Sequence, residues 1–149
     1  MRFFGRKDEI AELHNIRNLS LHTARFTIVT GRRRSGKTSL LLKAYEDLDD
    51  LLYFFVARKS EEELCKDFVN EIKEKLQIPI LGDVTRFADI FKYLLQLSKT
   101  RPLTIIIDEF QDFKRVNASV FSDMQKIWDL NKQDAHVNLV VCGSIYSLM

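Results

Sequence analysis

Apolar residues gather in four short runs along the chain. They are rich in β-branched and aromatic residues and show little polar alternation: RFTIVT (25–30), LLYFFVA (51–57), LTIIIDEF (103–110) and NLVVCGS (138–144). Runs of this length and composition predict buried strands. Strands that are apolar on both sides are typical of a parallel sheet with helices on both faces.

Between these runs, apolar residues recur at three- and four-residue spacing, which predicts amphipathic helices. Ser60 and Glu63 have the spacing of a capping box, which predicts a helix start at that point. The predicted helices cover 6–19, 37–48, 61–76, 85–97 and 118–130. Strands and helices therefore alternate, and the fold class that we expect is α/β, with three layers around a parallel sheet.

Composition fits this picture, because 149 residues with 46% hydrophobic and 30% charged side chains suit one soluble globular domain. The formal net charge of +2 is too small to imply a nucleic-acid partner. Residues 1–60 hold 12 Lys and Arg against 7 Asp and Glu, whereas the remainder is slightly acidic.

The chain shows no signal-peptide pattern at its start and no apolar run of about 20 residues, the length of a membrane helix. Cys65 and Cys142 lie far apart, and neither has a partner at metal-ligand spacing. We therefore expect a reduced, cytoplasmic protein in which both cysteines act as small buried apolar residues.

The segment GRRRSGKT (31–38) fits the phosphate-loop pattern G-x-x-x-x-G-K-[ST] at every fixed position. It follows a predicted strand and opens a predicted helix, so its backbone amides and the helix N-terminus can hold a phosphate. In this pattern Lys37 contacts the β- and γ-phosphates, and Thr38 offers its hydroxyl to Mg²⁺. The expected nucleotide contacts are Gly31, Arg32, Arg33, Arg34, Ser35, Gly36, Lys37, Thr38 and Ser39.

The three arginines of the loop occupy variable positions of the pattern. Their side chains can be solvated charge, or they can contact the nucleotide, a neighbouring subunit or nucleic acid. We favour solvated charge, because exposed charges contribute little to binding or stability.

An acidic pair follows the third predicted strand, where a Mg²⁺–triphosphate site needs a carboxylate. We assign Asp108 to the metal site, either as a direct ligand or as a residue that hydrogen-bonds to a ligand. Glu109 is the better candidate to orient or deprotonate the attacking water. Ser144 ends the last strand and can either sense the γ-phosphate or form a turn. The expected catalytic residues are thus Lys37, Glu109 and Ser144.

The segment NKQD (131–134) matches the guanine-reading motif of GTPases, N-K-x-D. That motif follows an apolar strand, whereas here it follows a segment with helical spacing. The match is therefore interpreted as a helix end, and the Asp108–Glu109 pair points to ATP as the nucleotide.

The segments FFGRKDEI, GRRRSGKTSLL and IIIDEFQ together resemble the archaeal-type ATPase family, which is related to the STAND and AAA+ ATPases. The resemblance implies that Phe4, Gly5 and Arg6 lie near the adenine or ribose. It also implies that the strand of Ser144 lies between those of Gly31 and Asp108. It divides the chain into an N-terminal helix with an adenine-side element (1–20) and a nucleotide-binding core (21–149).

Members of that family continue through a fifth strand, a helical lid and a winged-helix region, so we expect this chain to hold part of such a domain. Further domains of the same chain are then expected partners. The strand of the phosphate loop would lie at a sheet edge, which invites self-association into a homo-oligomer. DNA is suggested only by the family, since Lys and Arg are scattered without interleaved aromatic residues.

The favoured function is Mg²⁺-dependent ATP hydrolysis coupled to conformational change in a larger protein. The alternative is a nucleotide-dependent switch or scaffold with little hydrolysis. A kinase is less favoured, because no arginine-bearing lid follows the acidic strand.

Overall fold

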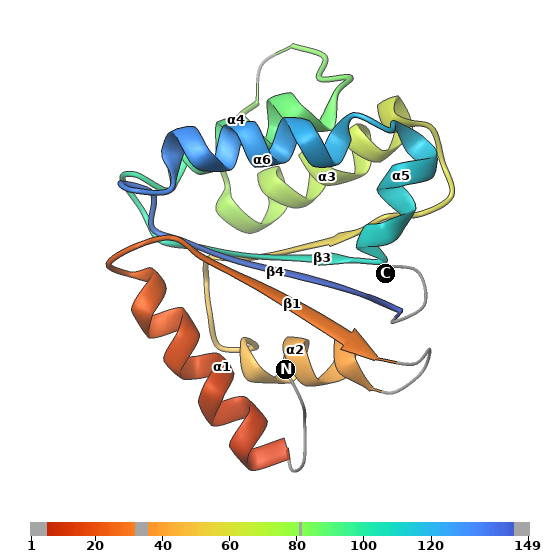
Figure 1. Ribbon diagram of the computed structural model, residues 1–149. Helices are drawn as coiled ribbons and strands as arrows, with labels where there is room; N and C mark the ends of the chain where they lie inside the picture. Colours follow the sequence, from red (N-terminus) through yellow and green to blue (C-terminus); the bar gives the residue numbers. More distant parts are fainter. Residues whose placement is uncertain (1–5, 32–35, 81, 145–149) are drawn as a thin grey trace.

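Four parallel strands form one sheet at the centre of the computed structural model, which describes residues 6–31, 36–80 and 82–144 (Figure 1). The strands are β1 (Arg25–Gly31), β2 (Leu51–Phe55), β3 (Leu103–Asp108) and β4 (Val137–Ser144). Their order is β1-β4-β3-β2, and every neighbouring pair is parallel. The parallel α/β fold is confirmed, and so is the place of the Ser144 strand between those of Gly31 and Asp108.

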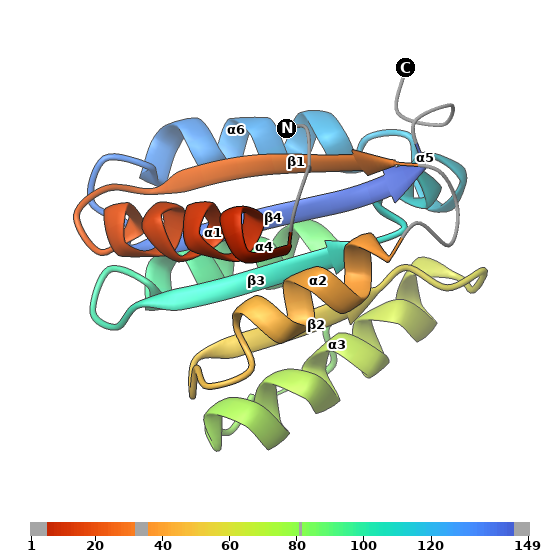
Figure 2. The same ribbon diagram turned by 90° about the horizontal axis from the view of Figure 1, so that it is seen from below.

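Helices cover both faces of this sheet and make the three expected layers (Figures 1 and 2). One face carries α1 (Arg6–Ser20) and α2 (Lys37–Ala44). The other carries α3 (Glu61–Leu76), α4 (Phe87–Leu97) and α6 (Val120–Asn131), while the short η1 (Phe110–Asp112) and α5 (Phe113–Val116) follow β3.

Each layer of helices closes its own apolar core against the sheet. The larger core, under α3, α4 and α6, contains an aromatic cluster with ring centroids 4.5–6.4 Å apart. Its members are Phe54, Phe68, Phe87, Phe91 and Phe113. The smaller core lies under α1 and α2 and includes Leu13, Leu41 and Ile106. The sheet is therefore buried on both sides, which explains the unbroken apolar runs of its strands.

Two expectations about the helices need correction. The helix after the phosphate loop ends at Ala44 rather than at residue 48, because Tyr45 leaves helical geometry and its hydroxyl donates to the Leu13 carbonyl at 2.9 Å. At the start of α3, the Ser60 hydroxyl accepts from the Glu63 amide at 3.2 Å, as a cap should. A capping box also predicts that the Glu63 carboxylate accepts from the Ser60 amide. Here this carboxylate accepts from the Ser60 hydroxyl instead, at 3.0 Å.

The two edges of the described sheet differ. Helix α3 runs beside β2 (Figure 2), and the Tyr53 amide donates to Glu71 Oε2 at 2.8 Å. This contact closes part of a strand edge that would otherwise present free backbone groups. On β1, at the opposite edge, Phe26 and Ile28 are 47% and 49% exposed.

Within the described ranges, none of the helices has the length and apolar character needed to cross a membrane.

The depth of the larger core predicts the stability of two matched variants. Leu94 in α4 is 0% exposed, whereas Leu130 in α6 is 75% exposed. We expect Leu94→Ala to lower the free energy of unfolding by about 2–5 kcal/mol, because it removes buried contacts and leaves a cavity. Leu130→Ala should change it by less than about 0.5 kcal/mol. Urea denaturation measures both, and similar losses in the two variants would contradict the described packing.

Candidate functional site

The phosphate loop joins the carboxyl end of β1 to the start of α2. Gly31 is the last residue of β1, and Gly36 caps α2 with φ 84° and ψ 9°. This left-handed conformation favours glycine, because a Cβ would strain it. Arg32, Arg33, Arg34 and Ser35 lie outside the described residues. The described ends of the loop have the strand–loop–helix context that an anion site requires.

The first turn of α2 carries the other loop candidates. Lys37 is buried, with 8% of its surface exposed, and Ser39 is exposed. Burial and the Asp108 carboxylate raise the pKa of the Cys142 thiol well above its ordinary value, while the positive charge of Lys37 opposes this shift. The Lys37 ammonium therefore acts on the same group of side chains as Asp108.

Thr38 and Asp108 meet although 70 residues separate them in the sequence. The Thr38 hydroxyl donates to Asp108 Oδ2 at 2.9 Å. Asp108 ends β3 and is 5% exposed, so its carboxylate is held at the buried end of the sheet beside the phosphate loop. The fold thus brings together the hydroxyl and the carboxylate that the sequence pattern assigned to Mg²⁺.

Asp108 accepts four hydrogen bonds from protein groups. Oδ2 accepts from Thr38 and, at 2.6 Å, from the Tyr53 hydroxyl. Oδ1 accepts from the Glu109 amide at 2.9 Å and from the Cys142 thiol at 3.2 Å. A carboxylate has about four lone-pair positions, so these donors fill its capacity. The carboxylate is accordingly fixed in orientation before any ligand binds.

The sequence pattern does not single out Tyr53 or Cys142 as site residues. Both cysteines are buried, as expected, but the Cys142 thiol also donates to Asp108. Burial and the adjacent Asp108 raise the pKa of Tyr53 far above its ordinary value, so its phenol stays a hydrogen-bond donor. The signal in the sequence that could have identified Tyr53 is its hydroxyl, which is a polar group within the apolar run of β2. This strand pairs with β3, which ends in Asp108.

Glu109 has an unusual backbone conformation, with φ 56° and ψ 42°. A non-glycine residue rarely adopts this left-handed region, and such outliers gather at functional sites. The strand therefore ends at Asp108 rather than at Phe110, and η1 begins instead. The Glu109 carboxylate is partly exposed and accepts from Gln111 Nε2 at 2.8 Å. The two neighbouring acids thus have different environments, one buried and one at the surface.

The remaining candidates are only partly described. Ser144 is the last residue of β4 and stands opposite Gly31 in the register, so its backbone lies at the phosphate-loop end of the sheet. Arg6 begins α1. Phe4 and Gly5 lie outside the described residues.

The chemistry of these groups fits a magnesium ion that arrives with a nucleotide. Mg²⁺ prefers oxygen ligands, and it is commonly held by one or two protein groups together with phosphates and water. Thr38 and Asp108 supply such oxygens. Across the described ranges, no three His, Cys, Asp or Glu side chains gather to hold a metal by themselves.

A sequence model for a family described as an ATPase domain predominantly from Archaea matches residues 3–149. The chain belongs to this archaeal ATPase family. Residues 3–149 therefore form a nucleotide-binding ATPase core.

Two proteins of Methanocaldococcus jannaschii are similar in sequence. The uncharacterized protein MJECL04 is 29% identical over 147 residues, which cover 99% of this chain and 30% of that protein. The uncharacterized protein MJ0424 is 43% identical over 56 residues, which cover 38% of this chain and 54% of that protein. The chain therefore spans well under two thirds of either relative's length.

Solved structures of two archaeal proteins share the fold. The Walker-type ATPase PABY2304 of Pyrococcus abyssi superposes with a TM-score of 0.65 at 19% identity, covering 95% of this chain and 45% of that one. Cdc6p from Pyrobaculum aerophilum gives a TM-score of 0.55 at 18% identity, with 96% and 40% covered.

In this archaeal ATPase chain the NKQD segment is a helix end, as interpreted from the sequence. Asn131 is the last residue of α6, and its side-chain amide donates to the Ile127 carbonyl at 2.7 Å. A turn follows, and β4 starts only at Val137. The segment therefore does not have the strand context of a guanine-reading motif.

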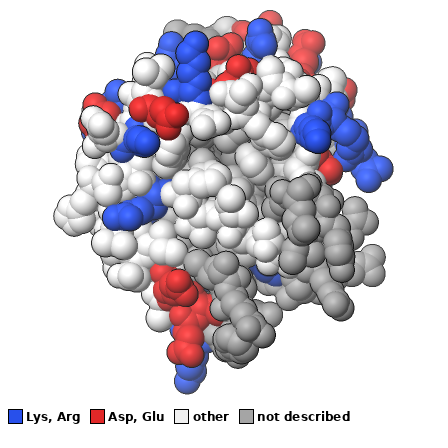
Figure 3. All heavy atoms as spheres, viewed as in Figure 1, with Lys and Arg blue, Asp and Glu red and all other residues white. Residues whose placement is uncertain are grey.

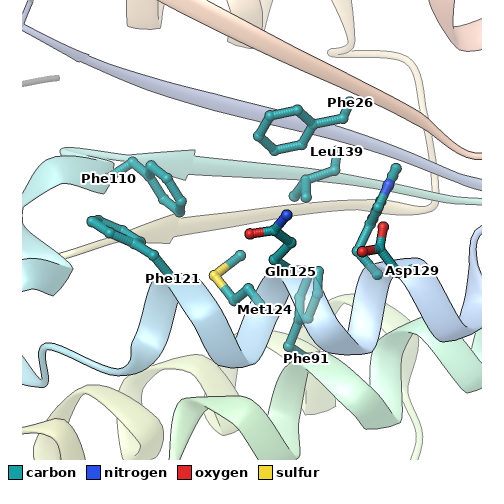
Figure 4. A pocket seen from close by; sticks show the side chains of 9 residues that line it. Phe26, Phe91, Phe110, Phe121, Met124, Gln125, Asp129 and Leu139 are labelled. Carbon is teal, nitrogen blue, oxygen red and sulfur yellow. The ribbon is translucent and has the colours of Figure 1, made fainter. Parts of the chain in front are cut away.

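An apolar pocket of about 360 Å³ lies between α6 and the sheet, on the face opposite α2 (Figure 4). Its lining is mainly aromatic: Phe26, Phe91, Phe110, Phe121, Met124, Gln125, Trp128, Asp129 and Leu139. Such a surface offers few donors to phosphate, so the pocket is separate from the candidate nucleotide site. Phe110 lines it and directly follows Glu109 in the chain.

Alanine is usually more stabilising than glycine at the same position. The left-handed conformation of Glu109 predicts the opposite for two variants that remove its carboxylate, Glu109→Gly and Glu109→Ala. Alanine at a left-handed position is strained by about 1–2 kcal/mol. Glycine avoids this strain but loses about 0.5–1 kcal/mol through its greater freedom in the unfolded chain. We expect Glu109→Gly to be more stable than Glu109→Ala by about 0.5–1 kcal/mol. Urea denaturation of the two variants decides the order, and a more stable alanine variant would contradict the backbone assignment.

Proposed function

We propose that this archaeal ATPase domain binds ATP with Mg²⁺, hydrolyses it, and uses the cycle to change conformation in a longer protein. The observation that carries the proposal is the hydrogen bond between Thr38 and Asp108 beside the phosphate loop. It joins the residue type that coordinates Mg²⁺ in phosphate loops to an acid at the end of another strand.

The phosphates would be held by the backbone amides of residues 31–38 and by Lys37, whose charge lies at the helix start. The Thr38 hydroxyl would hold Mg²⁺, and Asp108 would hold that hydroxyl through their hydrogen bond. When bound, the ion neutralises charge on the phosphate oxygens. Loop arginines and Ser39 are proposed to contribute at the rim of this site.

Glu109 is proposed to orient the attacking water and accept its proton. Its partly exposed carboxylate and left-handed backbone support this role, since both separate it from the buried Asp108. The Gln111 amide would hold the Glu109 carboxylate in one orientation. Ser144, opposite Gly31 at the same end of the sheet, would contact the γ-phosphate.

A nucleotide-dependent switch with little hydrolysis is the second candidate function. The hydrogen bond from Gln111 favours it, because Glu109 Oε2 already accepts a protein donor and is less available to the attacking water. A transition-state arginine can add about 10³–10⁵ in rate in this class of reaction. We propose no such arginine among the described residues, so turnover by residues 1–149 alone should be slow or absent.

The proposed partners follow from the length of the relatives. Because the match covers 99% of this chain but only 30% of MJECL04, further domains are proposed to receive the conformational change. Within the chain, residues 1–20 would provide the adenine side, with Phe4, Gly5 and Arg6, and residues 21–149 the core. Lys and Arg are scattered over the face in Figure 3, which supports weak rather than specific binding of DNA.

Removal of the Lys37 charge tests nucleotide binding. We expect ATP with Mg²⁺ to raise the melting temperature of the wild type, since a ligand at 100 times its Kd adds about 2.7 kcal/mol of stability. Lys37→Ala should lose most of this gain, and GTP should give less of it. Lys43→Ala, on the exposed side of the same helix, is the matched control and should keep it. Equal responses to ATP in the two variants would contradict the proposed site.

Substitution of Glu109 separates hydrolysis from binding. We expect Glu109→Gln to keep the ATP-dependent stabilisation, because the amide preserves shape, and to lower the already slow turnover by at least about 10²-fold. Phosphate release at saturating ATP measures turnover. Rapid turnover by wild-type residues 1–149 would contradict the expected slow rate. Where the wild type shows measurable turnover, an equal rate in Glu109→Gln would contradict the role of Glu109.

A further inference from the structure

Tyr53 stands out among the groups around Asp108, because nothing in the phosphate-loop pattern calls for it. It lies on β2, at the edge of the described sheet, and β2 pairs with β3. Its hydroxyl donates to Asp108 Oδ2 at 2.6 Å, a short contact of the kind that charge-assisted hydrogen bonds make.

The register of the sheet explains how Tyr53 reaches this carboxylate. Phe55 is the residue of β2 opposite Asp108. Tyr53 precedes Phe55 by two residues, about 6.6 Å along the strand, and its side chain points to the same face. A phenol is long enough to span that step, whereas shorter side chains at this position would not reach Asp108.

The backbone of Tyr53 is anchored as well. Its amide donates to Glu71 Oε2 at 2.8 Å, so α3 holds the strand at the residue that carries the phenol. The side chain is partly buried and packs against the smaller core, as that of Leu51 does. Tyr53 is thus positioned by two contacts that are independent of any ligand.

The four donors on Asp108 restrict what this acid can do. Thr38 and Tyr53 occupy Oδ2, while Cys142 and the Glu109 amide occupy Oδ1. With all lone-pair positions in use, Asp108 would act on a metal through the Thr38 hydroxyl that it already holds, rather than by direct coordination.

We propose that Tyr53 is a positioning residue for the metal site: its phenol fixes the Asp108 carboxylate so that Asp108 orients the Thr38 hydroxyl for Mg²⁺. This inference rests on the proposed function. It assigns to β2 a part in the metal site that the loop and the acidic pair do not supply.

Tyr53→Phe tests the proposal with a readout that is independent of hydrolysis. Thermal shift is measured with saturating ATP at increasing Mg²⁺, and with ATP and a chelator. We expect the Mg²⁺ concentration for half-maximal stabilisation to rise about 10-fold, as for other groups that hydrogen-bond to metal-site residues. Stabilisation by ATP without metal should stay unchanged, because the phosphate loop and Lys37 are intact.

Tyr45→Phe is the matched control. It also removes a buried phenolic hydroxyl from the smaller core, but that hydroxyl donates to the Leu13 carbonyl. It should lower the melting temperature without moving the Mg²⁺ midpoint. If Tyr53→Phe does not fold, Cys142→Ala removes a donor from the other oxygen of Asp108 and should raise the midpoint in the same way.

The outcomes separate the two proposals. If ATP and Mg²⁺ do not stabilise the wild type, the proposed function fails and the role of Tyr53 fails with it. If the wild type responds but Tyr53→Phe keeps the wild-type midpoint, only the role of Tyr53 is overturned. The same holds if Tyr45→Phe shifts the midpoint equally, since the effect would then be structural.

Discussion

The contact between Thr38 and Asp108 is the constraint on which the rest of the site depends. One residue lies in the first turn of α2 and the other at the end of β3, and the sheet order brings them within 2.9 Å. Neither residue could serve a metal–phosphate site alone, because a hydroxyl lacks charge and a lone acid lacks the phosphate loop. The β1-β4-β3-β2 order places β4 between the strand that leads into the phosphate loop and the strand that ends in Asp108.

The carboxylate in this contact is buried and held in one orientation. Asp108 is 5% exposed, and an isolated charge at such a depth would be costly. Four donors from α2, β2, β4 and the Glu109 amide offset that desolvation and fix the carboxylate in one orientation. Glu109, the next residue, turns into a left-handed conformation and leaves the core. One change of backbone conformation at the end of β3 thus provides one rigid, buried acid and one partly exposed acid.

The sequence predicts the features whose signals are local. The phosphate loop has fixed spacing, and the four apolar runs specify buried parallel strands, so the fold, the loop and Asp108 follow from them. Tyr53, by contrast, contacts Asp108 only because β2 and β3 pair in one register, and no spacing along the chain reveals this. The conformation of Glu109 is likewise hidden, because glutamate carries no signal for a left-handed turn. The early end of α2 reflects a tertiary contact of Tyr45, which overrides helix propensity.

A crystal structure of this chain with a non-hydrolysable ATP analogue and Mn²⁺, solved with anomalous data, would show whether Thr38 and Asp108 form the metal site. We expect one manganese peak bonded to the Thr38 hydroxyl and to phosphate oxygens, with Asp108 still hydrogen-bonded to Thr38. A nucleotide bound elsewhere, or a manganese ion remote from both Thr38 and Asp108, would contradict it.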